Sequence, residues 1–293
     1  MTTAYFDCYS GISGDMTLGA LVDLGLPVEA LRSALASLPV DNYTIEASRV
    51  MRCGIGATQI KVTSGEHHPH RHFSHIVKII EGSGFSARVK ERAIEAFHKI
   101  AVAEAAVHET TVEKIHFHEV GAVDAIVDVV GAMWGLDELG IDRVEASTVA
   151  VGSGTVRAAH GEMPVPAPAT ARILAGIPVC TGPVTGELTT PTGAAILATV
   201  AERFGPLENF SITRVGYGAG SRVYEKHTNY LRVLLGEGSG AGSRLPVEKR
   251  ELALITTEID DMPAELFGHV LERLFAAGCL DAHIIPVQMK KNR

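Results

Sequence analysis

A stretch rich in glycine and serine divides this chain of 293 residues near its carboxyl end. Residues 236–248 read GEGSGAGSRLPVE, and such a composition is typical of a flexible linker. Beyond it the pattern predicts a strand, a helix and a second strand, a unit that buries too little apolar surface to fold by itself. We therefore expect a main domain over residues 1–236, a linker over 237–249, and a segment over 250–293 that either docks on the main domain or begins a longer one.

Strand and helix signals alternate along the main domain. A long amphipathic helix is predicted over residues 87–107, where apolar side chains recur at helical spacing. Strand patterns bounded by turn residues occupy residues 3–8, 43–50, 55–62, 212–217 and 230–235. Together these signals predict an α/β domain in which helices flank a mixed sheet, followed by a truncated ferredoxin-like βαβ unit.

Charge and composition exclude several classes of partner. The net charge of −8, without a run of Lys and Arg, argues against a nucleic-acid surface. The first residues lack a signal-peptide pattern, and the apolar stretch 122–133 is too short and too charged to span a bilayer. The four cysteines are scattered with no CxxC pair, which favours reduced thiols. We therefore expect a cytoplasmic protein that contacts neither nucleic acid nor membrane.

The segment HFHEVGAVDAIVD, residues 116–128, carries the clearest metal-binding pattern. If its start is extended, His116 and His118 share one side and Glu119 faces the other. If its second half is helical, Asp124 and Asp128 lie one turn apart on one face. Imidazoles and carboxylates in this arrangement can hold a divalent ion. A polar patch satisfied by hydrogen bonds beside a glycine turn is the alternative.

A second group of imidazoles precedes this segment. The loop GEHHPHRHFSHI contains five histidines within nine positions, His67, His68, His70, His72 and His75. Neutral imidazole binds nickel and zinc well, so the tract can collect either ion, and the first four residues are the predicted ligands. A solvated loop without a metal is the alternative.

Two turn-to-helix junctions have the pattern of anion sites. In GISGD, residues 11–15, the backbone around Gly11, Ser13, Gly14 and Asp15 can present N–H groups to a phosphate at the start of a helix. The alternative is that Ser13 or Asp15 caps the helix and the glycines serve the turn.

The second junction, TTPTG, covers residues 189–193 and offers Thr190, Thr192 and Gly193. Helix capping by Thr190, with proline at the first helical position, explains this motif by itself. In the last segment, Asp260 and Asp261 with Lys290 and Lys291 can hold a metal ion and a triphosphate between them. Exposed charges are the alternative there.

Seven segments in the same order carry a family resemblance. They are AYFDCYSGISGDMTLGALVDLG, IHFHEVGAVDAIVDVVG, HGEMPVPAPAT, ELTTPTGAAIL, GYGAGSR, TEIDDMPAEL and MKKNR. The chain resembles the LarC family, whose members insert nickel during assembly of the nickel-pincer cofactor of lactate racemase. The resemblance implies a CTP-dependent cyclometallase, in the lyase class, that acts on pyridinium-3,5-bisthiocarboxylic acid mononucleotide and uses CTP with Mg or Mn.

In that family CTP binds to the carboxyl-terminal part, which begins here at about Glu251 and breaks off inside MKKNR. The resemblance therefore implies that most of the nucleotide site lies outside this chain. We also expect the chain to work with its own carboxyl-terminal half and to form a homo-oligomer. Two other functions stay open from the residues. One is a nickel chaperone or storage domain without catalysis, and the other is a metal-dependent phosphotransferase that uses GISGD and TTPTG.

Overall fold

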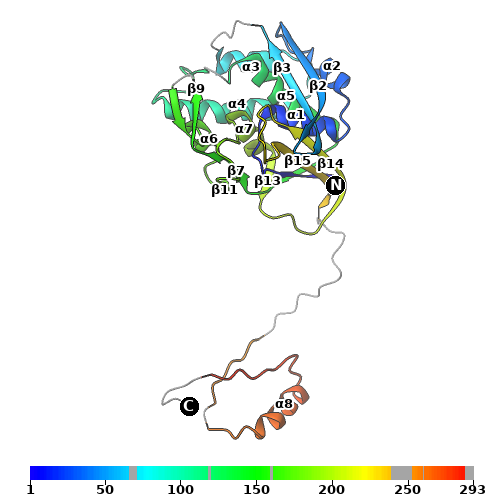
Figure 1. Cartoon of the computed structure of the whole chain (residues 1–293), viewed down its shortest axis with the longest axis vertical. Coiled ribbons are helices and arrows are strands. Elements are labelled where there is room, and N and C mark those ends of the chain that lie inside the picture. The colour runs from blue at the N-terminus through cyan, green and yellow to red at the C-terminus, as the bar shows by residue number, and fades with distance from the viewer. Residues whose placement is uncertain (66–70, 118–119, 159–160, 239–252, 260, 288–293) are drawn as a thin grey trace. The chain divides into compact units, whose positions relative to one another are not determined.

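The computed structural model describes residues 1–65, 71–117, 120–158, 161–238, 253–259 and 261–287. Within it the chain forms two compact units, Met1–Arg244 and Leu245–Arg293. The division between them falls inside the glycine-rich stretch. Among the described residues, most of the helices and all the strands belong to the first unit, which holds most of the candidate site residues (Figure 1).

A seven-stranded mixed sheet forms the centre of the first unit, in the order β13-β6-β1-β15-β14-β3-β2. β1 is parallel to β6, and β6 is parallel to β13, whereas β15 runs antiparallel to β1. The predicted mixed sheet is therefore confirmed. Its strands are β1 (Thr3–Asp7), β2 (Tyr43–Arg52), β3 (Ile55–Ser64), β6 (Arg143–Ala146), β13 (Ala201–Phe204), β14 (Phe210–Ala219) and β15 (Tyr230–Gly238).

In the part of the chain that the structure describes, four small strand pairs lie outside this sheet, and two of them bring side chains into the core, such as Val149 and Phe117. The four pairs are β4 (Arg71–His72) with β5 (His116–Phe117), β7 (Val149–Ala150) with β11 (Val179–Cys180), β8 (Gly152–Ser153) with β12 (Gly186–Glu187), and β9 (Thr155–Ala158) with β10 (Gly161–Pro164).

Helices join these strands, and their bounds follow local signals in the sequence. α4 spans the 21 residues that the apolar spacing predicts, and Ser86 caps it by accepting a hydrogen bond from the Val89 amide at 3.3 Å. The helices of the first unit are α1 (Gly14–Asp23), α2 (Val28–Leu35), α3 (Phe73–Glu81), α4 (Ala87–Val107), α5 (Val123–Glu138), α6 (Pro168–Ile173) and α7 (Pro191–Val200).

The hydrophobic core lies between the sheet and the helices. Successive side chains of a strand point to opposite faces, and in β1 the side chains of Ala4 and Phe6 enter the core together with residues of α1, α4, α5 and α7. Tyr5 and Asp7 consequently face the other side of the sheet. This alternation matters for function, because it places polar and aromatic groups at the end of a central strand.

The second unit differs from the prediction. Its described part contains one helix, α8 (Leu266–Ala276), and none of the residues of that helix is buried. Residues 253–259 and 281–287, which the pattern predicts as strands, form no strand there. Strands need partners and a core, and the apolar side chains of these segments, such as Leu254 and Ile285, are instead exposed. The ferredoxin-like fold of this segment stays a prediction.

In the described residues, no helix has both the length and the apolar character needed to cross a bilayer.

Candidate functional site

Two histidines from the two predicted imidazole groups lie side by side. His72 belongs to the histidine tract and His116 opens the HFHEVG segment, and the antiparallel pairing of β4 with β5 sets them directly opposite each other. Their ring centroids are 3.9 Å apart. His75, one turn into α3, lies edge-on to His72 with centroids 5.5 Å apart. Strand pairing thus joins groups that the sequence presents as separate.

The ring of His72 makes a hydrogen bond to the backbone. Its Nδ1 atom lies 3.1 Å from the carbonyl oxygen of Ile115. A carbonyl can only accept, so Nδ1 carries the hydrogen and Nε2 keeps a free lone pair. Metal-binding histidines commonly donate their second ring N–H to a backbone carbonyl in this way. His72 is partly buried and His116 is exposed, so the pair is open to an ion from solvent.

The predicted ligands form no complete metal site among the described residues. Among them, no three His, Cys, Asp or Glu side chains come together in a way that could hold an ion. The imidazole pair and the carboxylates Asp124 and Asp128 therefore do not form one such group. The other predicted ligands, His67, His68, His70, His118 and Glu119, lie outside the described residues.

The two predicted anion loops pack against each other. Ile12 of GISGD forms a parallel bridge with Thr189, and the Thr190 amide donates to the Ile12 carbonyl at 3.1 Å. A Cβ on Gly193 would lie 2.8 Å from the Cα of Ser13, so only glycine fits at this approach. The amide of Gly11 closes its own turn by donating to the Cys8 carbonyl at 2.9 Å. The two helix starts thus lie together at one place in the fold.

Thr190 caps α7, as the sequence predicts. Its Oγ1 accepts a hydrogen bond from the Gly193 amide at 3.2 Å, and Pro191 occupies the first turn. The Thr192 hydroxyl lies 3.4 Å from that of Thr190. Ser13, by contrast, makes no side-chain capping bond to α1. Its hydroxyl donates to Asp15 instead, so capping of α1 by Ser13 is wrong.

Two carboxyl groups meet at the start of α1. Asp15 accepts hydrogen bonds from the Ser13 hydroxyl, the Met16 amide and the Ser221 hydroxyl. Asp128 reaches the same place from α5 and packs on Gly14, where a Cβ would lie 2.5 Å from its own Cβ. The Oδ1 atom of Asp128 is buried and has no hydrogen-bond partner within the described part of the chain.

Burial controls the protonation of this carboxyl pair. It raises the pKa of Asp128 well above the usual range, and the negative charges of Asp15 and Asp124 raise that pKa further. Burial also raises the pKa of Asp15, although the three hydrogen bonds to its carboxylate oppose the change. A phosphate at this position would meet two acidic groups, so the site suits a proton or a cation better than an anion.

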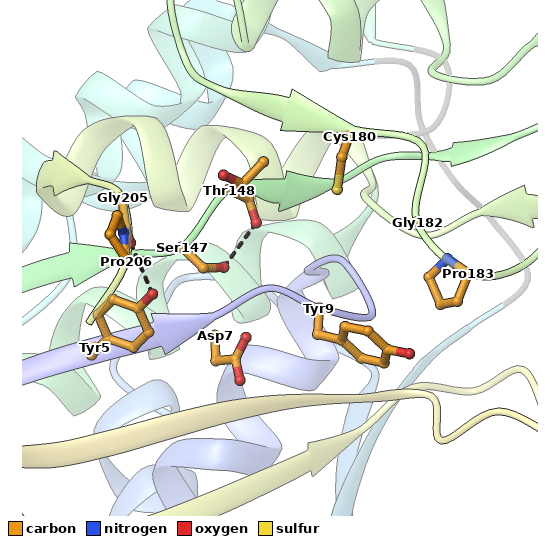
Figure 2. A pocket seen from close by; sticks show the side chains of 10 residues that line it. All are labelled: Tyr5, Asp7, Tyr9, Ser147, Thr148, Cys180, Gly182, Pro183, Gly205 and Pro206. Carbon is orange, nitrogen blue, oxygen red and sulfur yellow. Dashed lines mark hydrogen bonds between the residues drawn. The ribbon is translucent and has the colours of Figure 1, made fainter. Parts of the chain in front are cut away.

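A pocket of about 570 Å³ opens where three parallel strands end (Figure 2). Asp7 is the last residue of β1, and Tyr9 lies two residues beyond it. Ser147 and Thr148 come directly after β6, and Gly205 with Pro206 directly after β13. Tyr5, Cys180, Gly182 and Pro183 complete the lining. In open α/β sheets, ligands bind outside the carboxyl ends of parallel strands.

Polar contacts fix the walls of this pocket. The Tyr5 hydroxyl donates to the Gly205 carbonyl at 2.9 Å, and the Ser147 hydroxyl donates to the Thr148 carbonyl at 2.8 Å (Figure 2). Arg232 of β15 donates from Nε to Asp7 at 2.9 Å. Motif reasoning missed Tyr9 and Cys180, because neither belongs to a recognisable spacing. The position of Asp7 at the end of a strand, just before a glycine-rich loop, is the signal that could have indicated this edge.

The remaining predicted residues lie in the second unit. Asp261 is exposed in a bend, whereas Asp260, Lys290 and Lys291 lie outside the described residues. The predicted metal and triphosphate site at these positions therefore stays a prediction.

A comparison with known families decides the identity of the chain. The model of a family described as nickel insertion protein matches residues 4–293. The chain belongs to the nickel insertion protein family. This confirms the family resemblance that the seven sequence segments carry, and it makes nickel the ion to consider at the imidazole pair.

Curated relatives of this nickel insertion protein agree with the family match. A protein of Citrifermentans bemidjiense, with the provisional name nickel insertion protein, is 51% identical over 294 residues, covering 100% of this chain and 75% of the relative. A relative from Syntrophobacter fumaroxidans with the same provisional name is 49% identical and covered to 74%. A protein of Desulfitobacterium hafniense named pyridinium-3,5-bisthiocarboxylic acid mononucleotide nickel insertion protein is 48% identical, with 100% of this chain and 73% of that protein covered. No solved structure matches the chain.

Proposed function

We propose that this chain inserts nickel into pyridinium-3,5-bisthiocarboxylic acid mononucleotide, and that the imidazole pair His72 and His116 receives the nickel ion. The observation that carries the proposal is the pair itself, with ring centroids 3.9 Å apart in a chain of the nickel insertion family. The name of the Desulfitobacterium hafniense relative, at 48% identity, supports the choice of substrate.

Nickel is the cargo of this reaction, and the chemistry of the ligands suits it. Imidazole nitrogen is a good ligand for nickel, and the Nδ1 bond from His72 to the Ile115 carbonyl leaves Nε2 free to bind. Two imidazoles hold an ion more loosely than a closed site with four ligands. A carrier that must release its metal to a substrate needs such an open site.

Other predicted ligands lie close to His72 or His116 in the sequence and are proposed to bind the same nickel ion. His67, His68 and His70 precede His72, and His118 with Glu119 follows His116. Each lies within a few residues of one member of the pair, so they are the first candidates to complete the nickel site. Asp128 is proposed to act elsewhere, with Asp15 at the carboxyl pair beside α1, and the negative charge of Asp124 lies near that pair.

The mononucleotide and CTP are proposed to bind at other regions of the protein. At the junction of GISGD with TTPTG, the glycines lie against neighbouring backbone and side-chain atoms, and Asp15 adds a carboxyl group. We therefore expect any phosphate contact there to come from Thr190 and Thr192 at the start of α7. CTP with Mg or Mn is proposed to bind mainly to the carboxyl-terminal half, including Asp260, Asp261, Lys290 and Lys291. Assembly with that half, or as a homo-oligomer, belongs to the same proposal.

Equilibrium dialysis of the full chain with nickel tests the imidazole pair. We expect the His72→Ala/His116→Ala variant to bind nickel at least about tenfold more weakly than the unmodified chain. His98→Ala, which removes an exposed histidine of α4, is the matched control and leaves nickel binding unchanged. Nickel binding that is the same in all three proteins contradicts the proposed site.

The reaction itself is tested by adding nickel, CTP and the mononucleotide substrate to the chain together with its carboxyl-terminal half. We expect the nickel-containing product, detected by mass spectrometry, to form with CTP and to be reduced in the double histidine variant. Nickel binding without any product would indicate a chaperone or storage role instead. Hydrolysis of a nucleotide without nickel would favour a phosphotransferase.

A further inference from the structure

The pocket at the ends of β1, β6 and β13 has walls that suit a flat aromatic ring. Tyr9 has 58% of its surface exposed although it lies beside a concave surface. Tyr5 is 6% exposed, and the bond from its hydroxyl to Gly205 holds it in place. Figure 2 shows Tyr5, Asp7 and Tyr9 in sequence along β1 and the loop after it. The volume of about 570 Å³ lies within the range of small-molecule sites.

A carboxylate lies at the wall of this pocket. Asp7 ends β1, and the Oδ2 atom of its carboxylate accepts two hydrogen bonds from the Arg232 guanidinium of β15, so the two formal charges balance. Burial raises the pKa of Tyr5, and the negative charge of Asp7 raises it further. The face of a phenol ring attracts a cation, and the exposed Tyr9 offers such a face beside the pocket.

We propose that this pocket binds the pyridinium ring of the mononucleotide, with the Tyr9 ring stacked on it and Asp7 facing its positively charged nitrogen. The inference rests on the proposed function for the identity of the ligand. In that ligand the ring nitrogen carries the positive charge and the ribose phosphate, and the two thiocarboxylate groups stand at ring positions 3 and 5. The thiocarboxylate groups therefore point away from Asp7 when the nitrogen faces it.

The reactivity of Cys180 can report ligand binding in the pocket. Its thiol is exposed and belongs to the lining of the pocket. Cys53 is also exposed, but it lies at the turn between β2 and β3, outside the lining. A ligand in the pocket will slow alkylation of Cys180 and leave Cys53 unaffected, so the two thiols form an internal comparison.

Binding of nicotinamide mononucleotide to the full chain, measured by calorimetry, is the first test. This probe carries a pyridinium ring on a ribose phosphate, and its reduced form has a neutral ring of similar shape. We expect the oxidised form to bind about tenfold more tightly than the reduced form, and Tyr9→Ala to weaken its binding about tenfold. Tyr9→Phe keeps the ring and is expected to bind like the unmodified chain.

A matched control comes from a second cavity of the same size. Tyr43 lines that cavity, which is formed by residues of α2 and β2 and by the loop between them. Tyr43→Ala is expected to leave the affinity for the nucleotide unchanged. Circular dichroism checks that each variant is folded.

Alkylation with iodoacetamide is the second test, with mass spectrometry as the readout. Saturating oxidised nucleotide is expected to slow labelling of Cys180 several-fold without changing Cys53. The inference is overturned if the nucleotide does not bind at about 10 mM, if both ring forms bind equally, or if Tyr9→Ala and Cys180 labelling show no effect. Nickel dialysis of the same unmodified protein separates the two proposals. If this protein binds the nucleotide but does not bind nickel, only the imidazole site is refuted.

Discussion

The side chain of Asp128 lies directly on Gly14, where an added Cβ would stand 2.5 Å from the Cβ of Asp128. α5 can approach the start of α1 this closely only because Gly14 has no side chain. The carboxyl group of Asp128 is thereby carried to Asp15, which produces the acidic pair at the junction of the two predicted anion loops.

Replacement of Gly14 with alanine tests this close approach. Gly14→Ala is expected to lower the free energy of unfolding by about 1–3 kcal/mol, because the new methyl group must displace Asp128 or bend α1. Gly84→Ala is the control, since its Cβ would make an ordinary contact of 3.6 Å with Ser37. Urea denaturation measures both variants, and equal stability of the two would contradict the packing.

The pKa of Asp128 predicts how stability depends on pH. Because burial raises this pKa in the folded chain, the contribution of Asp128 to stability is fully present below its unfolded pKa of about 3.9. It is lost as pH rises through the higher folded pKa. Asp128→Asn removes this loss, so the variant is expected to be about 1–3 kcal/mol more stable than the unmodified chain at pH 8.

The difference between these two proteins should become small near pH 4, where both side chains are neutral. Thermal unfolding at several pH values between 4 and 8 measures it. A stability difference that is constant over this range would show that Asp128 is ionised in the folded chain throughout.

The cysteines are expected to differ strongly in reactivity. Cys8 is fully buried, and burial together with the negative charge of Asp7 raises the pKa of its thiol. Cys53 and Cys180 are exposed. In the folded chain without ligand, Cys8 should therefore alkylate at least about a hundredfold more slowly than either of them. Rapid labelling of Cys8 in native buffer, followed by mass spectrometry, would argue against its place in the core.

The long helix α4 provides a test of the core. Phe97 is fully buried on this helix, whereas Val102 on the same helix is 46% exposed. Phe97→Ala is expected to cost about 3–5 kcal/mol of unfolding free energy through loss of buried surface and a remaining cavity. Val102→Ala should change stability by less than about 0.5 kcal/mol. Similar losses in chemical denaturation for both variants would mean that the apolar face of α4 is assigned incorrectly.

The cap of α7 separates a structural role of TTPTG from a binding role. Thr190→Ala removes the acceptor for the Gly193 amide and should cost about 1 kcal/mol, while Thr190→Ser keeps the acceptor and most of the stability. Calorimetry with inorganic phosphate on the same variants then shows whether Thr190 also contacts an anion. A Thr190→Ala variant as stable as the unmodified chain would show that the cap contributes little.

Much of the secondary structure could be predicted because its signals are local. The apolar period of residues 87–107 marks α4, and Thr190 with Pro191 marks the start of α7. In each case the deciding contacts join residues within a few positions of one another. The strands predicted in the second unit did not form in the described residues, because strand formation depends on partners elsewhere in the chain.

The candidate sites depend on contacts that no local signal contains. His72 meets His116 only through the pairing of β4 with β5, and Asp128 meets Asp15 only through the packing of α5 on α1. The pocket exists because β13, β6 and β1 lie in that order and end at one edge. The sequence by itself determined the family, the span of α4, the start of α7 and the residue types suited to nickel. The tertiary structure decided which of those residues meet, because strand order and helix packing minimise the free energy of the whole fold rather than of any one segment.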